Sequence, residues 1–371
     1  MISVCHLTSV HADHDDRIFF KMCRSAAAAG YKTFQAAPGK SDCEEEGVVL
    51  RAIRVPSWRP LRATLGAWRA YKAALATGAS IIHFHDPELL WVGFLLKRRG
   101  RRVVFDMHEL VVSQILDKPW LGPAWFRRWV VSIYSRIERR AVERFDAIVL
   151  AESGYSEELL PRYPDQRDKF HVIRNLPVLA IIDQGAGTTH PNDLFTVIYV
   201  GGLSRIRGIR ELIEAVGRLE GVRLHLLGWW ESDAFRRECE GLSGYAHTRD
   251  LGSVRMDEVY GPMRAADLGA LMLYPLKNHT TSRPIKTYEY MACGLPIVAS
   301  DFPEWEVSIS DYAWFADPKD VGAIARAIAY ARDHQEEGRM RGRAGRAAVE
   351  AGLCWEREAE RLIDLYRQLA Q

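Results

Sequence analysis

Short apolar runs alternate with helical patterns along almost the whole chain, and this alternation limits the possible folds more than any other feature. In the first half the apolar runs lie at 2–7, 32–37, 80–85, 102–106, 146–151 and 170–174. Patterns of helical periodicity lie between them, near 17–29, 61–77, 88–99, 123–144 and 154–161. Strands that alternate with helices favour parallel sheets with helices on both faces. The sequence therefore predicts an α/β fold.

A break in this pattern separates two halves of the chain. Residues 176–193, LPVLAIIDQGAGTTHPND, end in Gly, Thr, Pro and Asn and predict a linker. Beyond it, strands are expected at 195–200, 222–227, 268–273 and 295–299. Helices are expected at 208–219, 231–240, 256–264 and 284–292, and three more within 318–370. We therefore expect two doubly wound domains with a cleft between them, where ligands bind beyond the carboxyl ends of the strands.

The composition is that of a soluble globular protein with room for two hydrophobic cores. The chain has 371 residues, of which 48% are hydrophobic and 26% charged. No apolar run approaches the ~18 residues of a membrane span. The N-terminus MISVCHLTSV lacks the features of a signal peptide, so we expect the protein in the cytoplasm. The six cysteines show no C-x-x-C pair and no metal-ligand spacing, so we expect reduced thiols.

Positive charge gathers in the first half. Residues 1–175 carry 27 Lys and Arg against 20 Asp and Glu, whereas the remainder carries 23 against 28. The stretch 51–72 holds six basic residues and no acid. Its apolar residues follow helical spacing from Leu61 to Trp68, and Trp58 precedes them. Such a stretch suits an anionic membrane surface, and WLGPAWFRRWV at 120–130 adds to the pattern.

Two other interpretations of the basic stretch remain open. Nucleic acid would attract the same charge, but no nucleic-acid motif accompanies it, so we expect no nucleic-acid partner. An amphipathic helix could also pack on its own sheet with its basic residues outward.

A strand, a Gly-Gly turn and a basic loop precede a helix in VIYVGGLSRIRGIRELIEAV, residues 197–216. Gly201 and Gly202 let the backbone approach a ligand, and the helix N-terminus offers free N–H groups. Arg205 and Arg207 add guanidinium groups, which suit phosphate oxygens. An ordinary strand–turn–helix corner with two exposed arginines would look the same.

The stretch SRPIKTYEYMACGLPIVAS, residues 282–300, predicts a helix followed by a strand. Thr281 or Ser282 can cap this helix, Pro284 suits its first turn and Gly294 can end it.

Two charged residues of this helix predict a nucleotide site. Lys286 lies near the positive helix end, which is unfavourable for a lysine unless an anion is near. Glu289, three residues later, lies on roughly the same face and could accept hydrogen bonds from a ribose diol. Ammonium for phosphate and carboxylate for ribose form a coherent nucleotide clamp, although Lys286 could also be a solvated surface lysine.

Polar residues crowd the carboxyl ends of the first-half strands. HADHDDR, residues 11–17, includes His11, Asp13 and Asp16. These side chains could bind a metal, cap a helix, or hydrogen-bond a sugar. IIHFHDPELL and VVFDMHELV each end a strand with imidazole and carboxylate groups: His83, His85 and Asp86 in the first, Asp106, His108 and Glu109 in the second. Strand alternation places His83 and His85 on one face, and a positioned His or Asp could accept a proton from a hydroxyl.

Several of these segments together resemble a known family. YVGGLSRIRGIRELIEA, LHLLG, AADLGALMLYP and RPIKTYEYMACGLPIVAS are similar to the C-terminal domain of the retaining glycosyltransferases of family 4. HLTSVHADHDDRIFFKMCRSAAAAGY and HFHDPELL resemble a subgroup often found among bacterial surface-polysaccharide enzymes.

The resemblance implies the GT-B fold, in which two Rossmann-like doubly wound domains face a central cleft. Residues 1–178 would bind the acceptor, residues 190–352 would bind the nucleotide sugar, and the helix in 353–371 would pack back on the N-terminal domain. The implied reaction moves a sugar from a UDP-sugar or GDP-sugar to a hydroxyl of a glycan or lipid-linked acceptor. It implies no cofactor and no required metal. A lipid-linked acceptor would also fit peripheral contact of the basic stretch with the inner face of the plasma membrane.

The residue patterns and the resemblance together give the candidate site residues. The donor-binding residues would be Gly201, Gly202, Arg205, Arg207, Gly228, Ser282, Arg283, Pro284, Ile285, Lys286 and Glu289. The acceptor side would comprise His11, Asp13, Asp16, His85 and Glu109. The catalytic residues would be His108, Asp86, Arg207 and Lys286. We see no carboxylate to act as a covalent nucleophile, and the family favours a front-face mechanism in which the departing diphosphate guides the acceptor.

Two departures from the family pattern keep other functions open. Gly202 occupies the place of the family's first arginine, and Thr281 that of its first glutamate. We expect Lys286 and Arg205 to supply the missing positive charge. The alternatives are a GT-B sugar-nucleotide epimerase or hydrolase, and a non-catalytic nucleotide-binding partner of a polysaccharide assembly complex.

Overall fold

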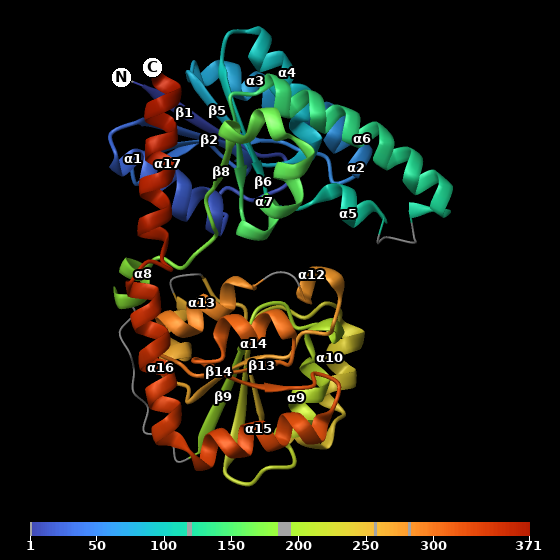
Figure 1. The fold of residues 1–371 in the computed structure, drawn as a ribbon, viewed down its shortest axis with the longest axis vertical. Helices are drawn as coiled ribbons and strands as arrows, with labels where there is room; N and C mark the ends of the chain where they lie inside the picture. Colours follow the sequence, from blue (N-terminus) through green and yellow to red (C-terminus); the bar gives the residue numbers. More distant parts are fainter. Residues whose placement is uncertain (1, 117–120, 185–193, 256–257, 281–282) are drawn as a thin grey trace. The chain divides into compact units, whose positions relative to one another are not determined.

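The computed structural model describes residues 2–116, 121–184, 194–255, 258–280 and 283–371 (Figure 1). The chain forms two compact units, and each is described by itself. Unit 1 comprises residues 1–175 and 357–371, and unit 2 comprises residues 176–356. The expected boundary at 178 lies close to the observed division, and the C-terminal residues return to the first unit.

Unit 1 is built on an eight-stranded sheet with the order β3-β4-β2-β1-β5-β6-β7-β8. Neighbouring strands are parallel except β3 and β4. The strands are β1 (Ser3–Leu7), β2 (Lys32–Pro38), β3 (Cys43–Glu45), β4 (Val48–Ile53), β5 (Ile81–Phe84), β6 (Arg102–Met107), β7 (Ala147–Leu150) and β8 (Phe170–Val172). The strand order reverses between β1 and β5, and doubly wound sheets bind ligands at such a point.

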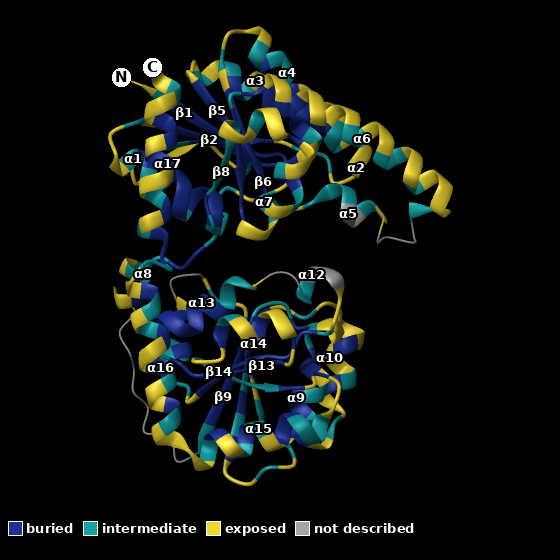
Figure 2. Cartoon of the chain, in the orientation of Figure 1, coloured by how far each residue is buried: buried dark blue, intermediate teal, exposed yellow. Residues whose placement is uncertain are grey.

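Helices pack on both faces of this sheet. The helical segments of unit 1 are the π-helical η1 (Asp16–Cys23), α1 (Arg24–Ala28), α2 (Arg59–Leu61), η2 (Arg62–Gly66), α3 (Ala67–Thr77), η3 (Pro87–Leu89), α4 (Leu90–Arg98), α5 (Val111–Leu116), α6 (Ala124–Arg144), α7 (Ser153–Leu159), η5 (Leu160–Arg162), η6 (Pro164–Lys169) and most of α17 (Trp355–Ala370). Residues of α3, α4 and α6 share one core with the strands, as in the packing of Phe84 against Phe145. Ile18 and Phe19 of η1 form another core with Val48 and Leu50. The central strands of the sheet, such as β5 and β7, are therefore buried, as Figure 2 shows.

Unit 2 contains a fully parallel six-stranded sheet with the order β11-β10-β9-β12-β13-β14. The strands are β9 (Phe195–Val200), β10 (Val222–Leu227), β11 (Thr248–Gly252), β12 (Leu268–Leu271), β13 (Ile297–Ser300) and β14 (Ala313–Ala316). The helices are α8 (Leu179–Gln184), α9 (Ile209–Val216), α10 (Asp233–Glu240), α11 (Tyr260–Arg264), α12 (Lys277–Thr280), α13 (Ile285–Ala292), α14 (Pro303–Ile309), α15 (Val321–Asp333) and α16 (Gln335–Glu350). The order reverses between β9 and β12.

The alternation in the sequence predicted most of these elements. Strands β9 and β10 have the predicted bounds, whereas β3, β4, β11 and β14 were not predicted. Residues 51–53 of the basic stretch belong to β4, where they pair with β2. Of the helix expected at 256–264, the structure shows α11 at Tyr260–Arg264. Residues 256–257 lie outside the described residues.

Two further expectations concern membrane-spanning helices and the state of the cysteines. Within the described ranges, no helix is long and apolar enough to cross a bilayer. All six cysteines lie in the described ranges and are free.

Candidate active site

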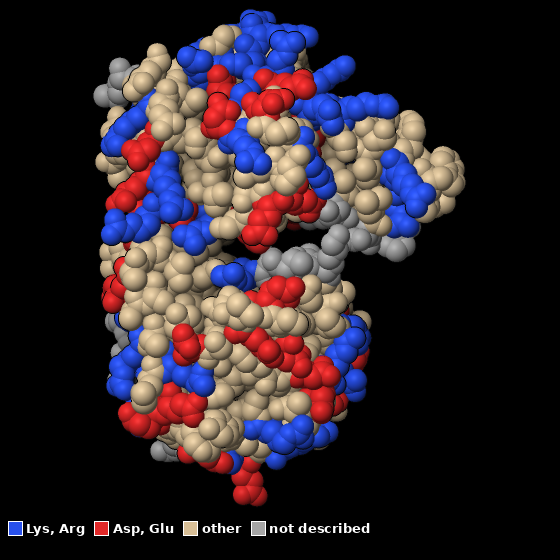
Figure 3. All heavy atoms as spheres, viewed as in Figure 1, with Lys and Arg blue, Asp and Glu red and all other residues tan. Residues whose placement is uncertain are grey.

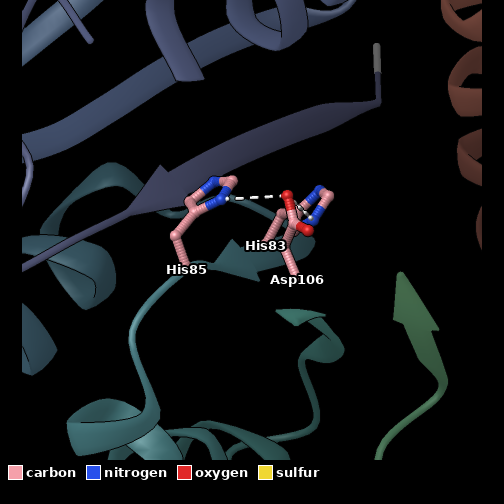
Figure 4. Close-up of side chains that lie close together, drawn as sticks. All are labelled: His83, His85 and Asp106. Atoms are coloured by element: carbon pink, nitrogen blue, oxygen red, sulfur yellow. Dashed lines mark ion pairs between the residues drawn. The ribbon is translucent and has the colours of Figure 1, made fainter. Parts of the chain in front are cut away.

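Three histidines and an aspartate form a buried cluster where β1, β5 and β6 approach their carboxyl ends. His6 pairs with His83 across β1 and β5. The rings of His83 and His85 stack with centroids 4.9 Å apart, so the two share a face as predicted. His85 Nδ1 lies 3.2 Å from Asp106 Oδ2, and His83 Nε2 lies 3.8 Å from the same oxygen (Figure 4). Burial lowers the pKa of His6 and of His83 well below the ordinary value, so both rings are neutral at physiological pH.

Arg17 supplies the counter-charge of this cluster. Its Nε and one terminal nitrogen each donate to Asp106 over 3.1 Å, and the terminal nitrogen also donates to the Ile173 carbonyl. Burial alone would raise the pKa of Asp106, but the guanidinium holds it well below its usual range. Nitrogen atoms of His83 and His85 and a carboxylate oxygen of Asp106 lie close enough together to hold a metal ion. Because Arg17 already occupies both carboxylate oxygens, the arrangement favours a guanidinium over a metal cation as the partner of Asp106.

The C-terminal helix closes the cluster from the other side. The Tyr366 hydroxyl lies 2.7 Å from His83 Nδ1 and 3.0 Å from His6 Nε2, and His6 Nδ1 lies 3.0 Å from His85 Nε2. Arg174 donates to Glu358 of the same helix. These contacts fix the orientation of the His6, His83 and His85 rings and tie α17 to the sheet of unit 1.

Asp86 is held at the end of β5 by residues that follow β1. The Thr8 hydroxyl and the Ser9 backbone N–H donate to Asp86 Oδ2 over 2.9 and 2.6 Å. The other oxygen, Oδ1, lies 3.6 Å from His11 Nε2. The carboxylate is therefore rigidly oriented, with one oxygen directed toward a partly exposed imidazole.

The rings of His11 and His108 lie close together, but their pKa values shift in opposite directions. His11 Nδ1 lies 3.0 Å from Asp15. Burial would lower the pKa of His11, but the carboxylates of Asp15 and Asp86 raise it overall. Burial lowers the pKa of His108 to about 3, although Asp106 opposes this shift. His108 is therefore a neutral, weak base at physiological pH, suited to hydrogen bonding rather than to proton removal.

The other acceptor-side candidates lie apart from this group or have partners of their own. His11, His85, Asp86 and His108 come together, with the His108 ring 5.4 Å from that of His85 and 5.7 Å from that of His11. Asp13 contacts His14, Asp16 is the ion-pair partner of buried Lys21, and Glu109 is exposed.

The candidate donor site lies at the carboxyl ends of β9 and β10 in unit 2, where two glycines approach closely. A Cβ atom on Gly228 would lie 1.8 Å from the Gly201 carbonyl oxygen. The backbone φ angles of these residues, 156° and 135°, also exclude most side chains. Both positions therefore require glycine, and they leave an open backbone surface before α9.

Arg207 presents an uncompensated charge beside this surface. A Cβ atom on Gly201 would lie 3.3 Å from an Arg207 guanidinium nitrogen, so the side chain lies over the turn. Its hydrogen bond to the Tyr199 hydroxyl is long, at 3.4 Å, and no carboxylate of the described residues forms an ion pair with it. Arg205 differs, because it is exposed, pairs with Glu238 and lies over the Phe235 ring. The first arginine's place in the family pattern, Gly202, lies against the Trp229 indole.

Lys286 and Glu289 lie at the start of α13 and contact each other. The Lys286 ammonium pairs with Glu289, whose buried carboxylate also accepts from the Tyr260 hydroxyl over 3.4 Å. Burial raises the pKa of Tyr199, and the charges of Arg207 and Lys286 both oppose that rise, so both cations act on the same hydroxyl.

The start and end of this helix differ slightly from the prediction. Helix α13 begins at Ile285, so Pro284 is the N-cap rather than a residue of the first turn, whereas Gly294 follows the helix end with φ 70° as predicted. Arg283 is exposed, and Thr281 and Ser282 lie outside the described residues.

Comparison with known proteins identifies the family. A model described as a glycosyl transferase 4-like domain matches residues 14–175, and one described as glycosyl transferases group 1 matches residues 195–333. The chain belongs to the group 1 glycosyltransferases. The first of these models covers most of unit 1, and the second covers most of unit 2.

Individual relatives of this glycosyltransferase are distant in sequence. Alpha-maltose-1-phosphate synthase of Mycolicibacterium smegmatis is 24% identical over 326 residues, which is 80% of each chain. Sucrose-phosphate synthase of Thermosynechococcus elongatus aligns with 100% of this chain and 99% of its own, with a TM-score of 0.77 and 21% identity. Anabaena Alr3699/HepE, solved in complex with UDP and glucose, aligns with 100% and 98%, with a TM-score of 0.68 and 14% identity. The glycosyltransferase therefore has the GT-B fold.

Sequence reasoning missed three residues of the unit 1 cluster as site residues. His6, Arg17 and Tyr366 form its most buried contacts. His6 gave a usable signal, because a histidine inside the apolar run of β1 must find a polar partner. Arg17 and Tyr366 lie in helical segments and gave no comparable signal.

Proposed function

We propose that this glycosyltransferase transfers a sugar, with retention of configuration, from a nucleotide diphosphate sugar to an acceptor hydroxyl, without a required metal. The observation that carries the proposal is the free charge of Arg207 over the glycine turn of β9. A diphosphate beside Gly201 and Gly228 would receive the Arg207 guanidinium and backbone N–H groups. Lys286 would leave its pairing with Glu289 for the phosphate, and Glu289 would then be free to hold the ribose.

We propose a UDP-sugar as the donor rather than a GDP-sugar. The Anabaena HepE structure contains UDP and glucose, which supports uridine in a related fold.

In the proposed step, the bond between the anomeric carbon and the diphosphate oxygen breaks. The acceptor oxygen then bonds to the same face of that carbon, and its proton passes to the departing diphosphate. Arg207 and Lys286 stabilise the charge that develops on the leaving group. On unit 1, Asp86 and His108 orient the acceptor hydroxyl, with His108 acting as a neutral hydrogen-bonding group.

We further propose a glycan or lipid-linked acceptor in bacterial polysaccharide or glycolipid assembly at the inner face of the membrane. Four apolar side chains of the stretch 51–72 are exposed, which supports contact with an anionic bilayer: Trp58, Leu61, Leu65 and Trp68. Two of its six basic residues are already paired, Arg51 with Asp42 and Arg62 with Glu88.

Thermal unfolding with nucleotides tests the donor proposal. UDP at about 100 times its Kd should raise Tm by roughly 5 °C, because it binds only the folded state. GDP at the same concentration should raise Tm less, and EDTA should leave the UDP shift unchanged. An equal shift with GDP would refute the choice of uridine, and loss of the shift in EDTA would refute metal independence. Slow release of glucose from UDP-glucose would separate an enzyme from a non-catalytic binder.

A further inference from the structure

Helix α6 extends well beyond the sheet that supports it. Its buried residues are Glu138, Ala141 and Val142, all toward its C-terminal end. The preceding residues, 124–137, are exposed or half-buried, and Figure 2 shows this part of the helix mainly in the colour of exposed residues. The outer part of α6 therefore makes little use of the core of unit 1.

A row of large apolar side chains lies along this outer part. Trp125 is 71% exposed and Trp129 is 57% exposed. Phe126, Ile133 and Ile137 are also exposed, and the spacing of four residues from 125 to 137 keeps the row on one side of the helix. Single exposed apolar residues are common, but a continuous row with two tryptophans marks an interaction surface.

The same helix carries unbalanced positive charge. It contains six arginines and two glutamates. None of the six arginines forms an ion pair with a carboxylate in the described parts of the chain. Glu138 is directed inward and accepts from the Tyr163 hydroxyl over 2.9 Å. By contrast, Arg339, Arg341 and Arg346 of α16 all pair with carboxylates. The projecting end of α6 shows both basic and uncharged surface in Figure 3.

We propose that residues 124–140 of α6, here called the α6 arm, bind the surface of an anionic lipid bilayer. Tryptophan rings settle at the level of the headgroups while arginines meet lipid phosphates. An apolar row alone would suit a second protein copy, and arginines alone would suit nucleic acid. The combination on one exposed helix favours a bilayer over either.

The α6 arm deepens the proposed function, because it would bring the enzyme to a lipid-linked acceptor. It differs from the stretch 51–72 in that none of its arginines forms an ion pair with a carboxylate of the described residues, whereas Arg51 and Arg62 do. The α6 arm is therefore the stronger membrane element of unit 1.

Sedimentation of the full chain with lipid vesicles tests this proposal. The probes are phosphatidylcholine vesicles with and without phosphatidylglycerol. Wild-type protein should pellet with the anionic vesicles at low salt and much less at about 0.5 M salt, where charges are screened. Arg128→Gln/Arg136→Gln/Arg140→Gln should weaken binding about 100-fold, and Trp125→Ser/Trp129→Ser at least about tenfold.

A matched control lies on α16, where Met340 is 60% exposed and Arg343 pairs with Glu336. Met340→Ser/Arg343→Gln should leave vesicle binding unchanged. Failure of the wild type to bind anionic vesicles would overturn the proposal, as would equal binding by the α6 variants. A dimer that dissociates in the α6 variants, without any effect of lipid, would assign the row to a second copy and also overturn it.

Binding of UDP, measured in parallel, separates this proposal from the proposed function. All α6 variants should bind UDP as the wild type does, because α6 belongs to unit 1 and the candidate donor residues to unit 2. A chain that pellets with vesicles but does not bind UDP would refute the donor assignment alone. A chain that binds UDP but no vesicles would refute the α6 arm alone.

Discussion

Arg207→Ala is expected to weaken UDP binding about 100-fold, the size of effect that follows when a phosphate loses a bidentate, charge-assisted partner. The guanidinium lies over the Gly201 turn, and no ion pair with a described carboxylate offsets its charge. Lys286→Ala should also weaken UDP binding strongly, because the diphosphate then loses the Lys286 ammonium. Isothermal titration calorimetry of UDP against each variant measures both effects.

Arg205→Ala is the matched control for this prediction. Arg205 lies two residues away in the same loop, but Glu238 already neutralises it. We expect its removal to change UDP affinity by less than about threefold, as is typical of an exposed pair. Equal losses for Arg205→Ala and Arg207→Ala would show that general positive charge, rather than the Arg207 position, governs donor binding.

Arg17→Met is expected to lower the free energy of unfolding of unit 1 by about 3–5 kcal/mol, because it leaves the fully buried Asp106 carboxylate without its partner. Urea denaturation followed by circular dichroism measures the loss. Asp106→Asn in the Arg17→Met background should recover part of it, since the orphaned charge is then removed. No loss in the single variant would mean that Arg17 is not the counter-charge of the cluster.

The pH dependence of the free energy of unfolding gives a second test of the role of Arg17. In the wild type, the folded-state pKa of Asp106 is held well below its unfolded value of about 3.9. Its stabilisation is therefore present above about pH 4 and is lost as the pH falls toward the folded pKa. In Arg17→Met, burial without the guanidinium should raise the folded pKa above the unfolded one. The deficit of the variant should then shrink on acidification, and a constant deficit would contradict this account.

The sequence predicted those parts of the fold that depend on local patterns. The bounds of β9 and β10 followed from their apolar runs, and the shared face of His83 and His85 followed from strand alternation. Strands β3 and β4 were missed because CEE is polar and LRAI continues into a basic stretch. Strand β14 was missed because its run AWFA is only four residues long, although Asp311 precedes it and Asp317-Pro318 follows it.

The candidate site could be predicted only in part, because its specificity comes from contacts between distant residues. The Gly201 turn and Lys286 were visible in the sequence as a loop and a helix start. The partner of each arginine was not visible: Arg17 meets Asp106 from another strand, and Arg205 meets Glu238 from another helix. Only the fold distinguishes Arg205, whose charge is compensated, from Arg207, whose charge is not.

The central claim is that unit 2 holds a nucleotide chiefly by its diphosphate. Calorimetric titration of the wild-type chain with UDP, UMP and uridine tests it most directly. We predict that UDP binds at least about tenfold more tightly than UMP, and that uridine binding is weaker still, because each lost phosphate removes charge-assisted hydrogen bonds. Equal affinity for UDP and uridine, or no binding of UDP, would contradict the claim.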